Sequence, residues 1–101
     1  MRIKAFEWDE GNVVHLELGH GVRPEEAEEV FAYKPVYRKT RKGHYVAMGP
    51  NHEGRYLTIV FALKQDSAAR VVTGWDMDRA EIKYRRSTGV KAREEMKDHE
   101  G

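Results

Sequence analysis

The 101-residue sequence contains no cysteine, which excludes a disulfide framework and any thiolate metal site. It has no long apolar run either: the longest, residues 57–63, is interrupted by Thr58 and is far shorter than the ~20 residues a membrane-spanning helix needs. Residues 1–7 have no apolar core and reach an acidic residue early, unlike a secretory leader. We therefore expect a cytoplasmic protein without membrane contact.

Sequence motifs of common enzymes are also missing. The chain has no glycine-rich nucleotide loop, no nucleophile elbow and no zincin helix. Hydrophobic residues make up 40% of the chain and charged residues 35%, which is typical of one domain with a modest core and a heavily charged exterior. We expect no cofactor and no metal.

The charges are segregated along the chain, although the net charge is only +1. Residues 1–33 carry three basic and eight acidic side chains, whereas residues 34–89 carry twelve basic and five acidic ones. Such asymmetry favours a surface that faces a polyanion. The alternative is that the charges only solvate two faces of the molecule.

The N-terminal third predicts a strand and two helices. In residues 3–8 apolar and polar side chains alternate weakly, which predicts a strand. Asp9 is a suitable N-cap for a helix that runs to about Leu18. Glycines 19 and 21 end that helix. A second helix begins at Pro24, has acidic residues in its first turns, and ends before Pro35.

From residue 36 the pattern has a period of two and predicts four strands. Their expected ranges are 36–41, 44–48, 55–63 and 69–75. The basic first range is expected at a sheet edge. The strand over 55–63 is apolar on both faces, which favours a central strand covered on both sides.

A final helix is predicted after residue 77. Asp78 and Glu81 form an acidic variant of the capping box, and Met77 and Ile82 are placed to pack as a hydrophobic staple. The helix is expected to close near Gly89. One domain over residues 1–89 is thus predicted, with a charged tail over 90–101 that is either a frayed helix or disordered.

The order and spacing of several segments resemble a known family. The segments are residues 6–10 (FEWDE), 20–31 (HGVRPEEAEEVF), 45–49 (YVAMG), 54–57 (GRYL), 59–61 (IVF) and 70–73 (RVVT). Together they resemble the BrnT toxins of bacterial type II toxin–antitoxin modules, small ribonucleases whose fold is similar to that of the RelE toxins. No single segment is a catalytic signature.

The resemblance implies an α+β fold, with an antiparallel sheet of about four to five strands, two N-terminal helices and one C-terminal helix. It implies a metal-independent endoribonuclease that cleaves RNA to inhibit translation. A ribbon-helix-helix antitoxin is the implied partner, and DNA is bound only through their complex. Many BrnT proteins have an arginine at the end of the last strand where this chain has Trp75 and Asp76. The alternative is therefore a non-catalytic RNA- or antitoxin-binding module of the same fold.

Basic residues interleaved with aromatic ones predict where RNA would bind. Cations neutralise phosphates, and aromatic faces stack on unpaired bases. The alternative is a set of solvated faces and core tyrosines. The RNA-binding candidates are Arg38, Lys39, Arg41, Lys42, Trp75 and Arg86.

Cleavage of RNA without a metal needs a base for the 2′-hydroxyl, cations at the phosphorus and an acid for the leaving 5′-oxygen. Arg79, Lys83 and Arg86 are spaced to share one helix face. RelE-like toxins rely on arginine, lysine and tyrosine. That resemblance implies Arg55, Arg79 and Lys83 as phosphate and transition-state groups and Tyr84 as an acid, all converging on one groove; the alternative for each is a surface salt bridge.

Among the histidines, His44 is the best general-base candidate, because it starts a strand inside the basic region. His20 is expected at a helix end. His15 and His20 are spaced so that they should not share a helix face, which argues against a two-histidine metal site. His52 and His99 are expected to be inert.

Overall fold

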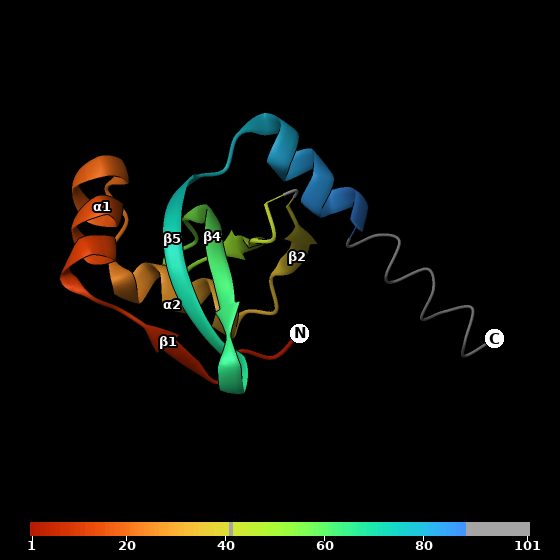
Figure 1. The fold of residues 1–101 in the computed structure, drawn as a ribbon. Helices are drawn as coiled ribbons and strands as arrows, with labels where there is room; N and C mark the ends of the chain where they lie inside the picture. Colours follow the sequence, from red (N-terminus) through yellow and green to blue (C-terminus); the bar gives the residue numbers. More distant parts are fainter. Residues whose placement is uncertain (41, 89–101) are drawn as a thin grey trace.

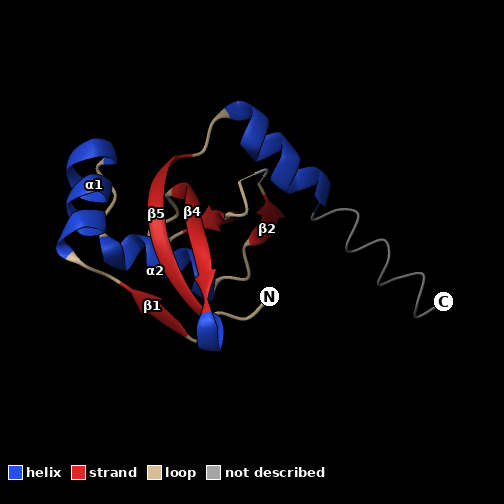
Figure 2. Cartoon of the chain, in the orientation of Figure 1, coloured by secondary structure: helices blue, strands red, loops and turns tan. Residues whose placement is uncertain are grey.

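The computed structural model describes residues 1–40 and 42–88 and has the α+β architecture expected from the sequence (Figures 1 and 2). In chain order the elements are β1 (Ala5–Glu7), α1 (Glu10–His20), α2 (Pro24–Ala32), β2 (Val36–Lys39), β3 (Tyr45–Pro50), β4 (Tyr56–Lys64), a 3-10 turn (Gln65–Ser67) and β5 (Ala68–Asp76). A C-terminal helix begins at residue 79 and is described as far as residue 88. Arg41 and the predicted tail over 90–101 lie outside the described residues.

The five strands form one sheet in the order β1-β5-β4-β3-β2. β2 is at an edge and β4 is in the middle, as predicted. Three of the four strand pairings are antiparallel, as expected, but β1 pairs with β5 in parallel, so the sheet is mixed. The buried amide of Asn12 donates to the carbonyls of Glu7 and Val71 at 3.0 and 3.1 Å, which ties the start of α1 to both strands where they separate.

Both N-terminal helices begin where the sequence predicted. Asp9 caps α1: its carboxylate accepts the Asn12 N–H, and the Asn12 side chain accepts the Asp9 N–H. Gly21 ends α1 in the left-handed conformation, with φ of 64°, which glycine adopts without a steric penalty. Pro24 is the first residue of α2.

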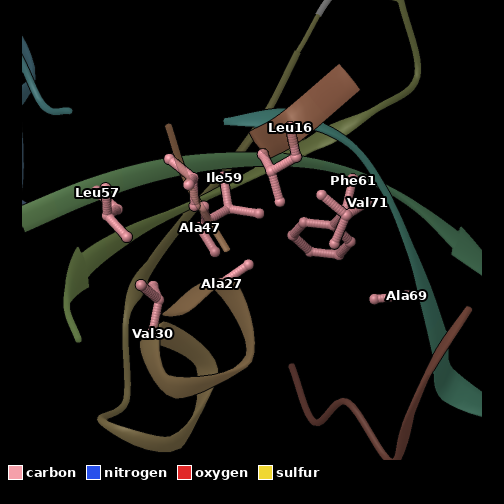
Figure 3. Packing of buried hydrophobic residues seen from close by; sticks show 10 residues of the cluster. Leu16, Ala27, Val30, Ala47, Leu57, Ile59, Phe61, Ala69 and Val71 are labelled. Atoms are coloured by element: carbon pink, nitrogen blue, oxygen red, sulfur yellow. The ribbon is translucent and has the colours of Figure 1, made fainter. Parts of the chain in front are cut away.

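The hydrophobic core lies between α1 and α2 and one face of the sheet, called here the helix-packed face (Figure 3). Leu57, Ile59 and Phe61 of β4 point into it and are fully buried. Gly74 lies at a tight α1–β5 contact: a Cβ there would be 2.8 Å from Cδ1 of Ile59 and 3.2 Å from Cδ1 of Leu16. A larger residue would force these two side chains to shift.

The opposite face, called here the open face, carries the C-terminal helix. In Figure 1 this helix (blue) lies on the other side of the strands from α1. It covers only part of the face, so the expectation that β4 is covered on both sides was wrong in part. Val60 and Ala62 are half-buried and Tyr56 is exposed. The reason is positional: the helix starts where β5 ends and crosses one end of the sheet.

Within residues 1–40 and 42–88, no helix has the length and apolar character needed to cross a membrane.

Candidate nucleic-acid interface

Strand register brings separate parts of the chain together on the open face. Met48 of β3 pairs with Thr58 of β4, and Thr58 pairs with Trp75 of β5. One step along, Arg38 of β2 pairs with Val46 of β3. Paired residues project to the same side of a sheet, so these side chains form adjacent rows.

These rows form the floor of a groove of about 450 Å³, called here the open-face groove. Its lining residues are Arg38, Lys39, Thr40, Val46, Met48, Thr58, Trp75 and Glu81. The groove contains Arg38, Lys39 and Trp75, three of the residues predicted to bind RNA.

The C-terminal helix supplies one wall of the groove and is fixed by its first turn. The Asp78 N–H donates to Glu81 at 2.9 Å and the Glu81 N–H donates to Asp78 at 2.8 Å, which is the predicted acidic capping box. Glu81 also accepts the indole N–H of Trp75, with distances of 3.1 and 3.2 Å to its two carboxylate oxygens. The indole ring is therefore held against the helix wall.

The rim of the groove joins β2 to the C-terminal helix. The guanidinium carbon of Arg38 lies 5.1 Å from the centre of the Tyr84 ring, within the range of a cation–π contact. Both side chains are exposed, and among the described residues neither Arg38 nor Lys39 has a carboxylate partner. The Arg38 charge thus faces the solvent at the mouth of the groove. Lys39 pairs with Tyr45, whose ring packs on the core residue Phe61, so its side chain leaves β2 on the helix-packed side and borders the groove only at the β2 edge.

A second hollow, of about 150 Å³, lies on the other side of the C-terminal helix. Tyr56, Met77, Ile82, Arg85 and Arg86 line it, so the predicted staple residues Met77 and Ile82 meet there. The Arg85 guanidinium lies 5.4 Å from the centre of the Tyr56 ring. Arg86, predicted to bind RNA, therefore lies away from Arg38.

The structure places Arg55 on the helix-packed face, and this corrects the prediction that it reaches the same groove as the last helix. Its guanidinium donates to Asp76 at 2.7 and 3.0 Å, to Glu26 at 3.2 and 3.3 Å, and to the Gly21 carbonyl at 3.0 Å. Within residues 1–40 and 42–88, no hydrogen bond or ion pair joins Arg55 to the C-terminal helix. Its charge is used to neutralise two carboxylates.

The electrostatics of this cluster keep all three groups ionised. Burial opposes ionisation of Glu26, whose side chain is 7% exposed, but the Arg23 backbone N–H and the Arg55 guanidinium outweigh it and lower the Glu26 pKa. The hydrogen bond from Arg55 lowers the pKa of Asp76. Asp76 and Glu26 in turn raise the pKa of Arg55. Asn51 completes the cluster by donating to Glu26 at 3.0 Å.

Arg79 and Lys83 are exposed on the C-terminal helix. At 100° per residue they point away from Glu81, which lines the groove, and from Tyr84, which contacts Arg38. Arg79 and Lys83 are therefore on the solvent side of the helix, and the predicted convergence of Arg55, Arg79 and Lys83 on one groove is not what the structure has.

The β2–β3 hairpin contains the remaining candidates. His44 is half-buried, and its carbonyl accepts the N–H of Thr40 at 2.8 Å and the Thr40 hydroxyl at 3.1 Å. Thr40 lines the groove, so the His44 backbone that it contacts lies next to the end of the groove, in the β2–β3 hairpin. Lys42 is exposed at the hairpin turn. Arg41 is outside the described residues.

The expectation that His15 and His20 are apart was wrong. Their rings are 5.5 Å apart, edge to face, and both lie beside β5, where the His20 ring centre is 6.4 Å from that of Trp75. The His15 ring contacts the Thr73 hydroxyl at 3.2 Å. No group of three or more potential metal ligands occurs among the described residues.

Sequence reasoning missed Thr58 and the role of Glu81 at Trp75. Thr58 is a polar residue inside an otherwise apolar strand, and that interruption is the signal that marks it. The contact between Glu81 and Trp75 has no such signal, because it depends on where the C-terminal helix packs.

No known protein-family model matches the chain, and none of the curated proteins matches it.

Proposed function

We propose that this protein is the toxin component of a type II toxin–antitoxin module and that it cleaves single-stranded RNA without a metal ion, which inhibits translation. The observation that carries the proposal is the open-face groove, which Arg38 and Lys39 of β2 line together with Trp75 of β5. Exposed cations bind phosphates, and the face of an indole ring stacks on an unpaired base of any type. The order and spacing of segments that resemble BrnT toxins add the nuclease chemistry.

The chemistry is assigned to the rim of the groove. Arg38 and Lys39 stabilise the charge that develops on the phosphorus. Tyr84, beside Arg38, donates a proton to the leaving 5′-oxygen, and His44 in the adjoining hairpin takes the proton of the 2′-hydroxyl. Arg55 is left out of the reaction because Glu26 and Asp76 hold it on the other face.

A second candidate function is a non-catalytic RNA- or antitoxin-binding module. Two observations favour it. The charge of Arg55 is neutralised by two carboxylates, and Trp75 stands where many BrnT proteins have an arginine. In either case the partner is a ribbon-helix-helix antitoxin that masks the groove with acidic side chains or an inserted helix, and DNA is reached only through that complex.

The decisive experiment is incubation of the purified protein with an unstructured RNA in excess chelator. We expect fragments that end in 2′,3′-cyclic phosphate, the product of attack by the 2′-hydroxyl. Tyr84→Phe and Arg38→Ala should lower the cleavage rate at least ~100-fold, the lower range for loss of one acid–base group, while the unfolding midpoint stays close to that of the parent protein.

Arg70→Ala is the matched control. Arg70 is a cation of β5 that pairs with Asp9 at 2.6 Å, and β5 places it outside the groove lining. This variant should cleave at the parent rate. RNA that binds without any cleavage would leave the binding module as the function, and a protein that neither binds nor cleaves RNA would refute the nuclease and the RNA-binding module and leave only antitoxin binding.

A further inference from the structure

The hydroxyl of Thr58 is buried without a hydrogen-bond partner. Thr58 is 1% exposed, and its Oγ1 has no partner among the described residues. Nearly all buried polar groups in folded proteins are paired, since an unpaired one loses its hydrogen bonds to water and gains nothing. An unpaired hydroxyl at this position therefore needs a reason.

The position of Thr58 in the groove gives the reason for its unpaired hydroxyl. Thr58 lies in the floor of the open-face groove, between Met48 and Trp75 in the strand register. Among the described residues, β3 and β4 contribute three side chains to this groove, Val46, Met48 and Thr58, of which Thr58 alone is polar. The groove thus has an apolar floor with one polar group in it and charged residues around it, and its volume of about 450 Å³ is within the usual range for a small-molecule subsite.

The neighbours define what the subsite accepts. Trp75 offers an aromatic face, and its ring is fixed because Glu81 accepts the indole N–H. Arg38 and Lys39 add positive charge on the β2 side. A flat aromatic ligand with a polar edge and a nearby phosphate matches all three features.

We propose that the open-face groove holds one unpaired nucleobase, stacked on Trp75. Its entry displaces the side chains that cover Thr58, so that its polar edge hydrogen-bonds to the Thr58 hydroxyl, while Arg38 and Lys39 bind the adjoining phosphates. This subsite deepens the RNA-binding function proposed above and rests on it. A hydroxyl both donates and accepts, so Thr58 distinguishes bases by the groups they present at that edge. Thr58 is then a specificity-determining residue rather than a structural one.

The test uses fluorescence of Trp75 as the readout. The chain has two tryptophans, so Trp8→Phe leaves Trp75 as the reporter. The probes are four short 2′-O-methyl oligoribonucleotides, oligo-U, oligo-C, oligo-A and oligo-G. They cannot be cleaved, because the attacking 2′-hydroxyl is blocked. Binding should quench Trp75 and should favour one of the four bases.

Thr58→Val keeps the shape of the side chain and removes the hydroxyl. We expect ~3- to 10-fold weaker binding of the preferred oligonucleotide, the range of one hydrogen bond, and unchanged binding of the others. The unfolding midpoint should stay the same or rise, since the removed hydroxyl has no partner in the free protein. Thr58→Ser restores the hydroxyl and should restore the base preference.

Thr73→Val is the matched control, because the Thr73 hydroxyl has a partner, His15, and lies outside the groove lining. It should lower stability slightly and leave the base preference unchanged.

The outcomes separate the two proposals. If the parent binds none of the oligonucleotides, the RNA function fails and the subsite fails with it. If the parent binds but Thr58→Val binds all four as the parent does, the subsite alone is refuted. A clear loss of stability in Thr58→Val also refutes it, because the hydroxyl would then have a structural partner such as a bound water.

Discussion

The two faces of the sheet differ in whether their arginine is paired with carboxylates. On the helix-packed face the Arg55 guanidinium makes hydrogen bonds to two carboxylates and a carbonyl. On the open face the Arg38 guanidinium lies over the Tyr84 ring and, among residues 1–40 and 42–88, has no carboxylate partner. An arginine is available to a ligand only where the fold has not already used its charge, and sequence alone does not reveal which arginine that is.

Polar groups differ between the faces in the same way. Glu26, a buried residue of α2, accepts hydrogen bonds from Arg23, Asn51 and Arg55. Thr58, buried on the open face, has no partner among the described residues. Complete pairing stabilises the fold, whereas an unpaired group is kept where a ligand supplies the partner.

The largest difference between the faces should come from removing the two arginines separately. Arg55→Met leaves Glu26 buried with one cation fewer, and we expect a loss of about 3 kcal/mol of unfolding free energy, the low end for a broken buried pair because Arg55 is 31% exposed. Arg38→Met should change it by less than about 0.5 kcal/mol. Urea unfolding monitored by circular dichroism measures both. Equal losses of unfolding free energy in the two variants would show that the two arginines do not differ in their structural role.

A smaller effect should follow from acidification. The folded-state pKa values of Glu26 and Asp76 are lowered, so their contribution is complete above the ordinary values of 4.5 and 3.8 and is lost as pH falls through the lowered values. Urea unfolding should therefore give a lower free energy at pH 3 than at pH 7.

Arg55→Met is the control for this pH dependence. It removes the main partner of Asp76 and one partner of Glu26, so the loss between pH 7 and pH 3 should shrink. Part of the loss should remain, because the Asn12 backbone N–H lowers the Asp9 pKa independently. A dependence as steep as that of the parent would mean that other carboxylates are responsible.

Substitutions on the open face should change RNA binding rather than the free energy of unfolding. Arg38→Ala combined with Lys39→Ala removes two phosphate contacts, so the slope of log affinity against log salt should fall by about 1.4, at roughly 0.7 per contact with single-stranded RNA. Fluorescence titrations at several salt concentrations give the slope. An unchanged slope would place the phosphates elsewhere, for example at Arg85 and Arg86 in the second hollow.

The smallest effect is expected at the wall of the groove. Glu81→Ala removes the side chain that accepts the Asp78 N–H in the capping box and the Trp75 indole N–H, and should cost about 1 kcal/mol of stability, while Asp78 still caps the helix. Glu81→Gln retains a side-chain acceptor for both N–H groups and should cost less. A larger loss of base preference in Glu81→Ala than in Glu81→Gln would show that the indole must be held in place.

Much of the local structure was predictable, because it depends on neighbours in the sequence. Asp9, Gly21, Pro24 and Asp78 define helix ends through caps and backbone angles that involve residues a few positions away. The alternation from residue 36 onward depends only on which side chains are apolar. The edge position of β2 and the central position of β4 followed from the same composition.

The main errors concern long-range geometry. The parallel pairing of β1 depends on how the chain leaves it for α1, and the carboxylate partners of Arg55 come from α2 and from the end of β5. None of these has a fixed spacing in sequence.

The sequence by itself determined the elements, their ends and the abundance of positive charge after residue 34, because caps, turns and apolar periodicity act over a few residues. Only the tertiary structure decided which face each cation occupies and which are already paired. Burial and carboxylate partners are set by elements that meet in space, and for that reason Arg38, Lys39, Thr58 and Trp75 form one groove while Arg55 stabilises the opposite face.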